Sequence, residues 1–315
     1  MGCLLRVVAC AILLLALAIG ARRLLESPAR TEPPRGLERE TIVDGVRWRS
    51  REAAADPGSA ARPPVVYVHG FLSSSATWKG VLASAAAGRE AVAVDLPGAG
   101  FSDRPWPFDY TVFGQAQHLI RYLDARGWPR VVLVGNSLGG AVCEVVAAAR
   151  PERISGLVLV DAASPRMRIP IGFRLLRTPV LGDLQIELLT RPVMAFALKR
   201  RLYANPARVT EQTVDDWWDP VPVPGTRRAA IASVRTSLSG TDRLLESIRV
   251  PTFVLWGKDD PLLDVSEGLS IASAIPGARF AAIPGAGHLP QEESPGAFSR
   301  EVSAFVRGLP EGGDP

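Results

Sequence analysis

The sequence predicts an α/β protein with a mostly parallel, doubly wound sheet and an inserted helical cap. Along the 315 residues, short apolar runs alternate with helical patterns, as in parallel sheets covered by helices on both faces. About ninety residues separate the apolar run ending at Asp161 from the next one near Pro251, too many for an ordinary connection. We therefore expect a core from residues 41–163 and 247–309, and a cap of short, proline-punctuated helices from residues 164–246.

The first 23 residues predict a membrane anchor or a signal segment, and residues 24–40 predict a flexible linker. Val7 to Ala21 is apolar and uncharged. As a helix it would be about 22 Å long, short of a hydrocarbon core of about 30 Å, and it also fits the apolar region of a cleaved signal peptide. Because Arg22 and Arg23 oppose translocation, we expect membrane association through an uncleaved segment, with secretion after cleavage as the alternative.

Charge and composition favour a membrane surface over nucleic acid as a binding partner of this chain. The formal net charge is +4; residues 1–51 hold nine arginines against five carboxylates, and residues 166–201 hold eight lysines or arginines against two carboxylates. Both regions would suit an anionic membrane surface, although a solvated face explains the second region equally well. Nothing resembles a nucleic-acid-binding module, and three cysteines give no disulfide framework.

The core begins with strand patterns. The segment Thr41 to Ser50 predicts two antiparallel strands joined by a turn near Asp44-Gly45. The apolar run 65–68 then leads into His69-Gly70-Phe71. A loop in this position can offer the backbone N–H of Phe71 to a developing oxyanion. We expect His69 to hold this loop rather than to react.

The stretch Gly135 to Gly140 follows an apolar run and precedes an alanine-rich helix. Glycines on both sides of Ser137 allow a strained turn that raises the serine oxygen above the sheet edge. The glycine spacing fits neither the P-loop nor the dinucleotide fingerprint. We therefore interpret Ser137 as a nucleophile, with a structural turn serine as the alternative. The N–H of Leu138, at the helix start, would be a second oxyanion donor.

A serine nucleophile needs a base and an orienting acid. His288 lies in a loop beyond a late apolar segment, whereas His118 falls in a helical stretch, so His288 is the predicted base. The acid should lie between the serine and the histidine along the chain. Asp260 follows an apolar run and precedes a proline. It is the preferred acid, with Asp259 and Asp161 as alternatives.

These motifs together resemble the α/β-hydrolase superfamily. The resemblance covers about residues 41–309 and rests on five motifs in order: His69-Gly70-Phe71, Asp95 to Ser102, Gly135 to Gly140, Gly257 to Pro261 and Gly287 to Pro290. The turn around Ser137 is similar to the nucleophile turn of carbon–carbon bond hydrolases acting on ring-cleavage products, and to that of monoacylglycerol lipases and esterases. The resemblance implies an α/β-hydrolase fold in which residues 164–246 form a lid over the active site.

Two departures within the superfamily favour ester chemistry. Epoxide hydrolases and haloalkane dehalogenases carry an aspartate where this chain has Ser137. Carbon–carbon hydrolases usually carry a tryptophan after the catalytic histidine, where this chain has Leu289. The resemblance therefore implies a serine esterase or lipase more strongly than a carbon–carbon hydrolase.

The expected activity is hydrolysis of a carboxylic ester of a hydrophobic substrate through an acyl-enzyme, with no cofactor or metal. Apolar cap side chains indicate such a substrate; Trp217 and Trp218 cannot share one helix face, so one of them should reach the pocket. The alternatives are a carbon–carbon bond hydrolase, more distantly a perhydrolase, and a non-catalytic binding protein on the same fold. The sequence leaves acyl chain length, oligomeric state and the side of the membrane open.

Overall fold

The computed structural model describes residue 34 and residues 39–58, 62–164, 171–235 and 244–310. The segment 1–23, predicted to contact a membrane, lies outside these ranges, as does most of the linker 24–40. Among the helices in the described ranges, none is long and apolar enough to cross a membrane.

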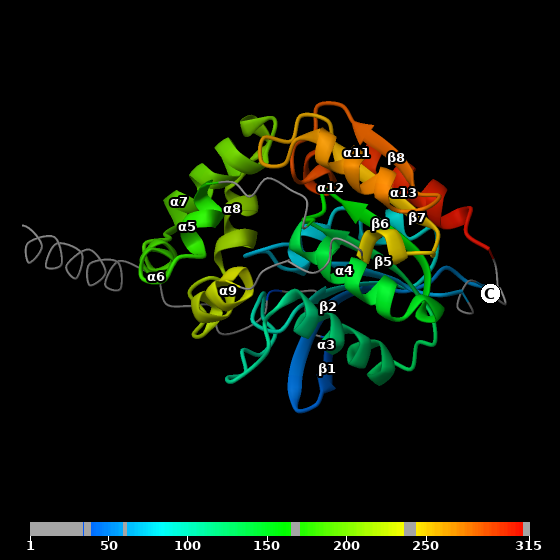
Figure 1. Cartoon of the computed structure of the whole chain (residues 1–315), viewed down its shortest axis with the longest axis horizontal. Coiled ribbons are helices and arrows are strands. Elements are labelled where there is room, and N and C mark those ends of the chain that lie inside the picture. Colours follow the sequence, from blue (N-terminus) through cyan, green and yellow to red (C-terminus); the bar gives the residue numbers. More distant parts are fainter. Residues whose placement is uncertain (1–33, 35–38, 59–61, 165–170, 236–243, 311–315) are drawn as a thin grey trace, which may run out of the picture.

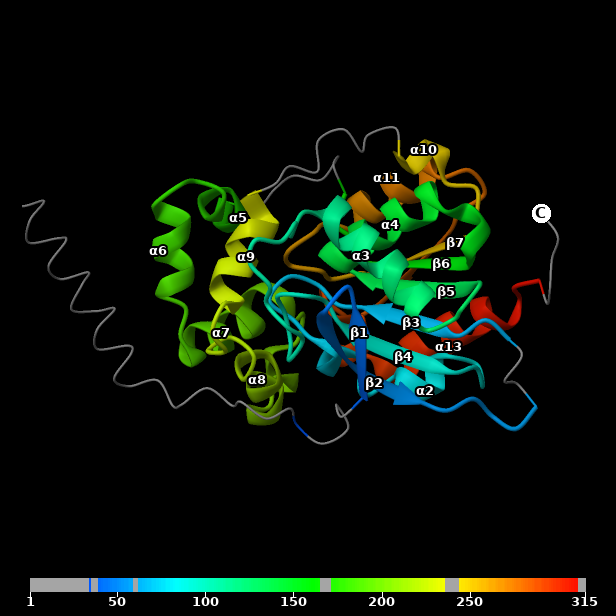
Figure 2. The same cartoon turned by 90° about the horizontal axis from the view of Figure 1, so that it is seen from below.

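A mostly parallel sheet forms the centre of the protein (Figures 1 and 2). Its strand order is β1-β2-β4-β3-β5-β6-β7-β8; the pairs β1–β2 and β2–β4 are antiparallel, and the other pairs are parallel. The predicted turn between β1 and β2 is present, with positive φ at Asp44 and Gly45 as short hairpin turns require. The strands are β1 Arg39–Val43, β2 Val46–Ala53, β3 Val65–Val68, β4 Ala91–Asp95, β5 Val131–Asn136, β6 Ile154–Val160, β7 Thr252–Gly257 and β8 Arg279–Ile283.

Helices cover both faces of the sheet and confirm the predicted fold class. One face packs against α3 (Val112–Ala125), α4 (Leu138–Ala149) and α11 (Val265–Ala274). The other packs against α2 (Leu82–Ala85) and α13 (Pro295–Arg307). Every residue of β3 to β7 is buried, which is why these strands read as continuous apolar runs. The short elements are η1 Ser75–Trp78, η2 Pro151–Arg153, α10 Leu244–Ser247 and α12 Pro290–Glu293.

The helices after β6 form a separate layer beside the core (Figures 1 and 2). Their own apolar cluster centres on Leu198, Val214 and Trp217. The predicted cap range 164–246 overlaps α10, but Leu245 is fully buried in the core cluster that includes α4, so α10 belongs to the core. The cap elements are α5 Ile171–Leu176, α6 Leu181–Glu187, α7 Arg191–Ala197, the π-helix η3 Leu198–Leu202, η4 Pro206–Arg208, α8 Glu211–Trp218 and α9 Thr226–Arg235.

Candidate active site

The sheet brings the predicted site residues to one edge. Ser137 directly follows β5, Asp260 follows β7, His288 follows β8 and Phe71 follows β3. These four strands are parallel, so their carboxyl ends meet at the same edge, where α/β proteins bind their ligands.

Ser137 occupies a strained turn between β5 and α4. Its φ of 52° and ψ of −120° are rarely adopted by a residue with a side chain. The turn also needs close backbone packing, because a Cβ at Gly139 would lie 2.4 Å from the carbonyl oxygens of Val68 and His69. The Ser137 N–H donates to the carbonyl of Val160 at 3.0 Å. Glycine at position 139 therefore lets the start of α4 sit against β3 and fixes the serine in place.

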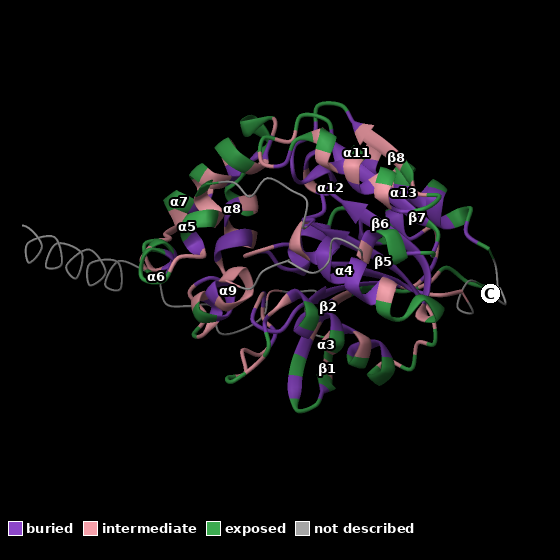
Figure 3. Ribbon diagram, in the orientation of Figure 1, coloured by how far each residue is buried: buried purple, intermediate pink, exposed green. Residues whose placement is uncertain are grey.

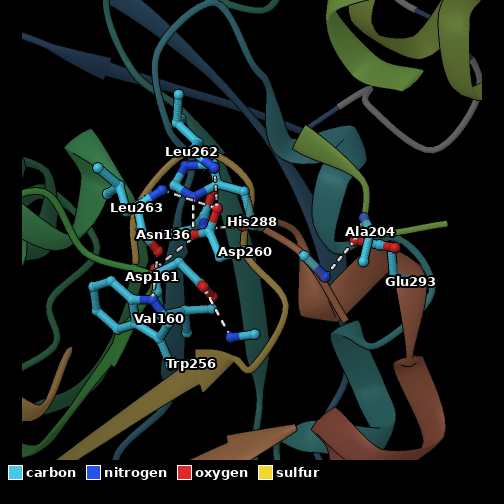
Figure 4. Close-up of polar contacts among 12 residues, drawn as sticks. Asn136, Val160, Asp161, Ala204, Trp256, Asp260, Leu262, Leu263, His288 and Glu293 are labelled. Atoms are coloured by element: carbon cyan, nitrogen blue, oxygen red, sulfur yellow. Dashed lines mark hydrogen bonds and ion pairs between the residues drawn. The ribbon is translucent and has the colours of Figure 1, made fainter. Parts of the chain in front are cut away.

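His288 and Asp260 form a buried, directly hydrogen-bonded pair (Figure 4). His288 Nδ1 lies 2.8 Å from Asp260 Oδ2, and the two side chains are 4% and 0% exposed. Asp260 Oδ1 accepts from the N–H groups of Leu262 and Leu263 at 2.7 and 3.0 Å. These donors fix the carboxylate, which in turn leaves Nε2 as the histidine nitrogen available to a nucleophile.

Ser137 and His288 line the same cavity of about 360 Å³. No hydrogen bond within the described residues joins the Ser137 Oγ to the His288 ring. Such contacts are commonly long in ligand-free enzymes and tighten when substrate fills the site. The structure thus brings the predicted nucleophile and base to one cavity.

The two alternative acids lie elsewhere in the hydrogen-bond network. Asp259 is exposed, and its Oδ2 accepts from the N–H of Gly285 at 2.8 Å. Asp161, at the end of β6, accepts from the N–H of Gly257 at 2.8 Å. Of the three aspartates, Asp260 is the one hydrogen-bonded to the histidine.

Asp161 is nevertheless part of the same buried cluster. Oxygens of Asp161 and Asp260 and a ring nitrogen of His288 all lie within 4.8 Å of one another. The Asp161 Oδ2 is buried, and no N–H or O–H group of the described residues donates a hydrogen bond to it. Burial, and then the adjacent Asp260 charge, hold the pKa of the Asp161 carboxyl well above its usual value. We therefore infer that Asp161 holds its proton to a higher pH than an ordinary aspartate does.

We expect the stability of Asp161→Asn, relative to wild type, to rise as the pH increases from about 4 toward neutrality. A carboxyl whose pKa is raised by folding keeps its proton where the unfolded chain has lost it, so the wild-type free energy of unfolding falls with increasing pH over that range. Asparagine cannot ionise and keeps an oxygen for the Gly257 N–H. Urea unfolding of both proteins at several pH values measures the difference. A difference independent of pH would show that Asp161 is not protonated.

The proposed oxyanion donors face the site from two elements. The N–H groups of Phe71 and Leu138 donate no hydrogen bond within the described part of the chain. Phe71 lines the main cavity and an adjoining one of about 40 Å³, whereas Leu138 lines only the smaller cavity. Each such donor, aimed at a developing oxyanion, typically contributes about 3 kcal/mol to lowering the barrier.

His69 has a structural position. Its Nε2 accepts from the N–H of Leu96 at 3.1 Å, so its Nδ1 donates to the carbonyl of Gly70 at 2.8 Å. Burial lowers the pKa of this imidazole and so favours the neutral form that both bonds require. His69 therefore holds the loop that carries Phe71.

The two cap tryptophans separate as helix geometry requires. Trp217 lines the cavity, and its Nε1 donates to Glu292 Oε1 at 3.2 Å. Trp218 does not line the cavity, and its ring centre lies 5.9 Å from the Arg227 guanidinium. The pocket prediction for Trp218 is therefore not supported, because successive side chains of a helix point in different directions.

The attachment of the histidine loop to the cap was not predicted. The His288 N–H donates to the carbonyl of Leu202 at 2.8 Å. The Glu293 carboxylate accepts from the N–H groups of Gly287, Ala204 and Asn205 at 2.7, 3.2 and 3.1 Å (Figure 4). The only signal in the sequence is an acidic residue five positions after the histidine, which does not reveal a partner ninety residues away.

The cavity is lined mainly by apolar side chains, and Arg201 alone carries a formal charge among its described lining residues. Such a lining suits a hydrophobic substrate with a few polar groups. The apolar lining comprises Phe71, Leu72, Ile171, Phe173, Leu176, Leu189, Met194, Ala197, Leu202, Trp217, Pro261, Leu262 and Leu289.

Comparison with known proteins places this fold and site in a family. The profile of the alpha/beta hydrolase fold matches residues 63–295. The chain belongs to the α/β-hydrolase fold family. This α/β-hydrolase is similar to a solved structure, Cfl2 of Burkholderia cenocepacia, with a TM-score of 0.76 and 27% identity over 85% of this chain and 95% of that one. The predicted family is therefore confirmed.

Curated relatives of this α/β-hydrolase differ in their chemistry. An uncharacterized protein of Mycobacterium tuberculosis is 29% identical over 89% of this chain and 83% of its own length. A 2-hydroxy-6-oxo-2,4-heptadienoate hydrolase of Pseudomonas putida is 28% identical over 77% of this chain and 88% of its own. A monoacylglycerol lipase of Xenopus laevis is 28% identical over 82% and 78%. Relatives at this level of identity therefore include both carbon–carbon and ester hydrolases.

Proposed function

We propose that this protein hydrolyses carboxylic esters with a hydrophobic acyl group through a covalent acyl-enzyme. The observation that carries the proposal is a buried His288–Asp260 pair that shares one largely apolar cavity with a strained Ser137. We also propose that residues 1–23 keep the enzyme at a membrane, where such esters are concentrated.

Each residue has a defined role in this reaction. Ser137 Oγ attacks the ester carbonyl while His288 Nε2 accepts its proton. Asp260 holds the ring and stabilises the imidazolium, and the amides of Phe71 and Leu138 receive the oxyanion. His288 then returns the proton to the departing alcohol. Water, deprotonated by His288, attacks the acyl-enzyme to release the acid and regenerate Ser137.

A labelling and turnover experiment tests this function. Folded wild type should react with a fluorophosphonate probe and should hydrolyse p-nitrophenyl esters, with kcat/KM rising with acyl length until the cavity is filled. Wild type that is folded but neither labelled nor active would indicate a protein that binds ligands without turnover. Efficient turnover of a dienoic ring-fission product, with negligible ester hydrolysis, would reverse the order of the two hydrolase candidates.

Carbon–carbon bond hydrolysis is the second candidate, and one observation favours it. Arg201 places an exposed guanidinium at the cavity, which could neutralise a carboxylate on a ring-cleavage product. One of the curated relatives is a dienoate hydrolase. The tryptophan usual after the catalytic histidine is, however, replaced by Leu289.

Arg201→Gln separates these candidates. If neutral esters are the substrates, we expect the substitution to change their kcat/KM by less than about threefold, because a neutral ester carries no charge that Arg201 could pair with. If dienoates are the substrates, their kcat/KM should fall by about tenfold or more. Steady-state kinetics with a neutral ester and with a dienoic ring-fission product measure both effects, and thermal unfolding shows whether the variant remains folded.

A further inference from the structure

Exposed apolar side chains gather on one part of the cap. The described residues include eleven exposed large hydrophobic side chains, and seven of these fall between residues 171 and 196. Single exposed hydrophobic residues are ordinary, but a concentration of them marks an interaction surface. The seven are Ile171, Leu175, Val180, Leu181, Leu188, Val193 and Phe196, and we call them the cap patch.

The spacing of the cap patch places its members together on each helix. Ile171 and Leu175 are four residues apart on α5, and Val193 and Phe196 are three apart on α7. Such spacings put side chains on the same helix face. Helices α5, α6 and α7 lie at the end of the molecule away from the sheet, with exposed residues on their outer side (Figures 1, 2 and 3). The cap patch therefore belongs to an outward-facing surface.

Basic side chains accompany the cap patch. Residues 171–201 contain six lysines or arginines against two acids. Of these, Arg174 and Arg200 are exposed and form no side-chain ion pair within the described part of the chain. Of the two acids on α6, Asp183 is already paired with Arg235 at 2.8 Å, and Glu187 is half-buried. The surface thus combines apolar side chains with uncompensated positive charge.

The same surface borders the catalytic cavity. Ile171 and Arg201 are both exposed, and both also line the cavity that contains Ser137. Whatever covers the cap patch therefore lies next to an entrance to the active site.

We propose that the cap patch docks onto an anionic lipid bilayer. The apolar side chains would enter the boundary between headgroups and acyl chains, and the arginines would contact lipid phosphates. A second copy of the chain fits less well, because a symmetric contact would place like charges opposite each other. If the protein hydrolyses esters as proposed above, the docked orientation lets a hydrophobic ester pass from the bilayer to Ser137.

The amino-terminal sequence strengthens this choice of partner. If residues 1–23 hold the chain at a membrane, the proline-rich residues 24–38 keep the core within about 45 Å of the lipid surface. Such tethering strengthens a weak surface contact, because binding of the cap patch to the bilayer becomes intramolecular once residues 1–23 are inserted.

Site-specific fluorescence on the full chain tests docking. In a Cys3→Ala, Cys10→Ala background, where Cys143 is buried, a fluorophore is attached through Phe196→Cys, a position that is 62% exposed. The matched control is Leu269→Cys on α11 of the core, which is 48% exposed. We expect lipid-borne nitroxides in vesicles containing phosphatidylserine to quench the label at position 196 several-fold more than the label at 269. Equal quenching at both positions would overturn the proposal.

Charge reversal and activity complete the test. Arg174→Glu combined with Arg200→Glu should abolish the excess quenching at 196 and leave hydrolysis of a short soluble ester unchanged, because neither arginine lines the cavity. Undiminished quenching would contradict the electrostatic part of the proposal. Proximity of two labels at 196 in lipid-free solution would assign the surface to a second copy instead. If the protein with native Arg174 and Arg200 docks but does not cleave soluble ester, the proposed function fails while the docking surface stands.

Discussion

Ser137→Ala is expected to lower kcat/KM for the best ester by about 10⁴- to 10⁶-fold and to abolish fluorophosphonate labelling. The hydroxyl is the atom that forms the acyl bond, and no other described nucleophile shares the cavity with His288. Alanine fits the same backbone, so the residual rate should reflect binding and the oxyanion donors alone. Burst kinetics with a p-nitrophenyl ester measure the loss directly.

The control for this variant is folding rather than activity. Ser137 has φ of 52°, and alanine tolerates this region no worse than serine, so the thermal unfolding midpoint should change little. A variant that unfolds cooperatively at the wild-type temperature yet keeps substantial turnover would show that another residue attacks the substrate.

Asp260→Asn is expected to reduce kcat by about 10⁴-fold with a smaller change in KM. The carboxylate accepts the Nδ1 proton of His288 at 2.8 Å, which leaves Nε2 unprotonated and ready to act as a base. An amide nitrogen turned toward Nδ1 would reverse the tautomer and place the proton on Nε2. Because Asn keeps an oxygen for the Leu262 and Leu263 N–H groups, the loss would report on the histidine rather than on the loop.

Two neighbouring aspartates serve as matched controls. Asp259→Asn removes an exposed carboxylate bonded to the Gly285 N–H and should leave kcat nearly unchanged. Asp161→Asn removes a carboxyl that we infer to be neutral already, so the acid limb of its pH–rate profile should coincide with that of wild type. A large loss at Asp161 with none at Asp260 would reassign the acid to the end of β6.

The strands and turns of the core could be predicted from short stretches of sequence, because apolar runs and glycines determine them locally. Apolar runs such as 131–134 suit a strand covered on both faces, and the glycines at positions 135 and 139 allow the close packing that the turn around Ser137 needs. Parallel strand order then brings Asp260 and His288 to the serine without any further information. The fold class could therefore be predicted from sequence together with the candidate residues.

The remaining features depend on contacts between distant segments. Spacing predicts that Trp217 and Trp218 separate, but not which of them reaches the cavity. Nor does it assign α10 to the core, because packing partners decide both. The raised pKa of the Asp161 carboxyl could not be predicted either, because it requires knowing that Asp260 shares its buried site. The properties of single positions in the sequence do not reveal which distant residues lie in contact.

The His288 N–H donates to the carbonyl of Leu202, and the Glu293 carboxylate accepts from the N–H groups of Gly287, Ala204 and Asn205. These contacts limit how one cap can replace another during evolution. The cap contributes main-chain groups to these contacts, so a chimera that carried a relative's lid would keep them only where the new backbone follows the same path between residues 202 and 205. Side chains in that stretch can therefore vary, whereas an insertion or deletion there would remove contacts that position the histidine loop.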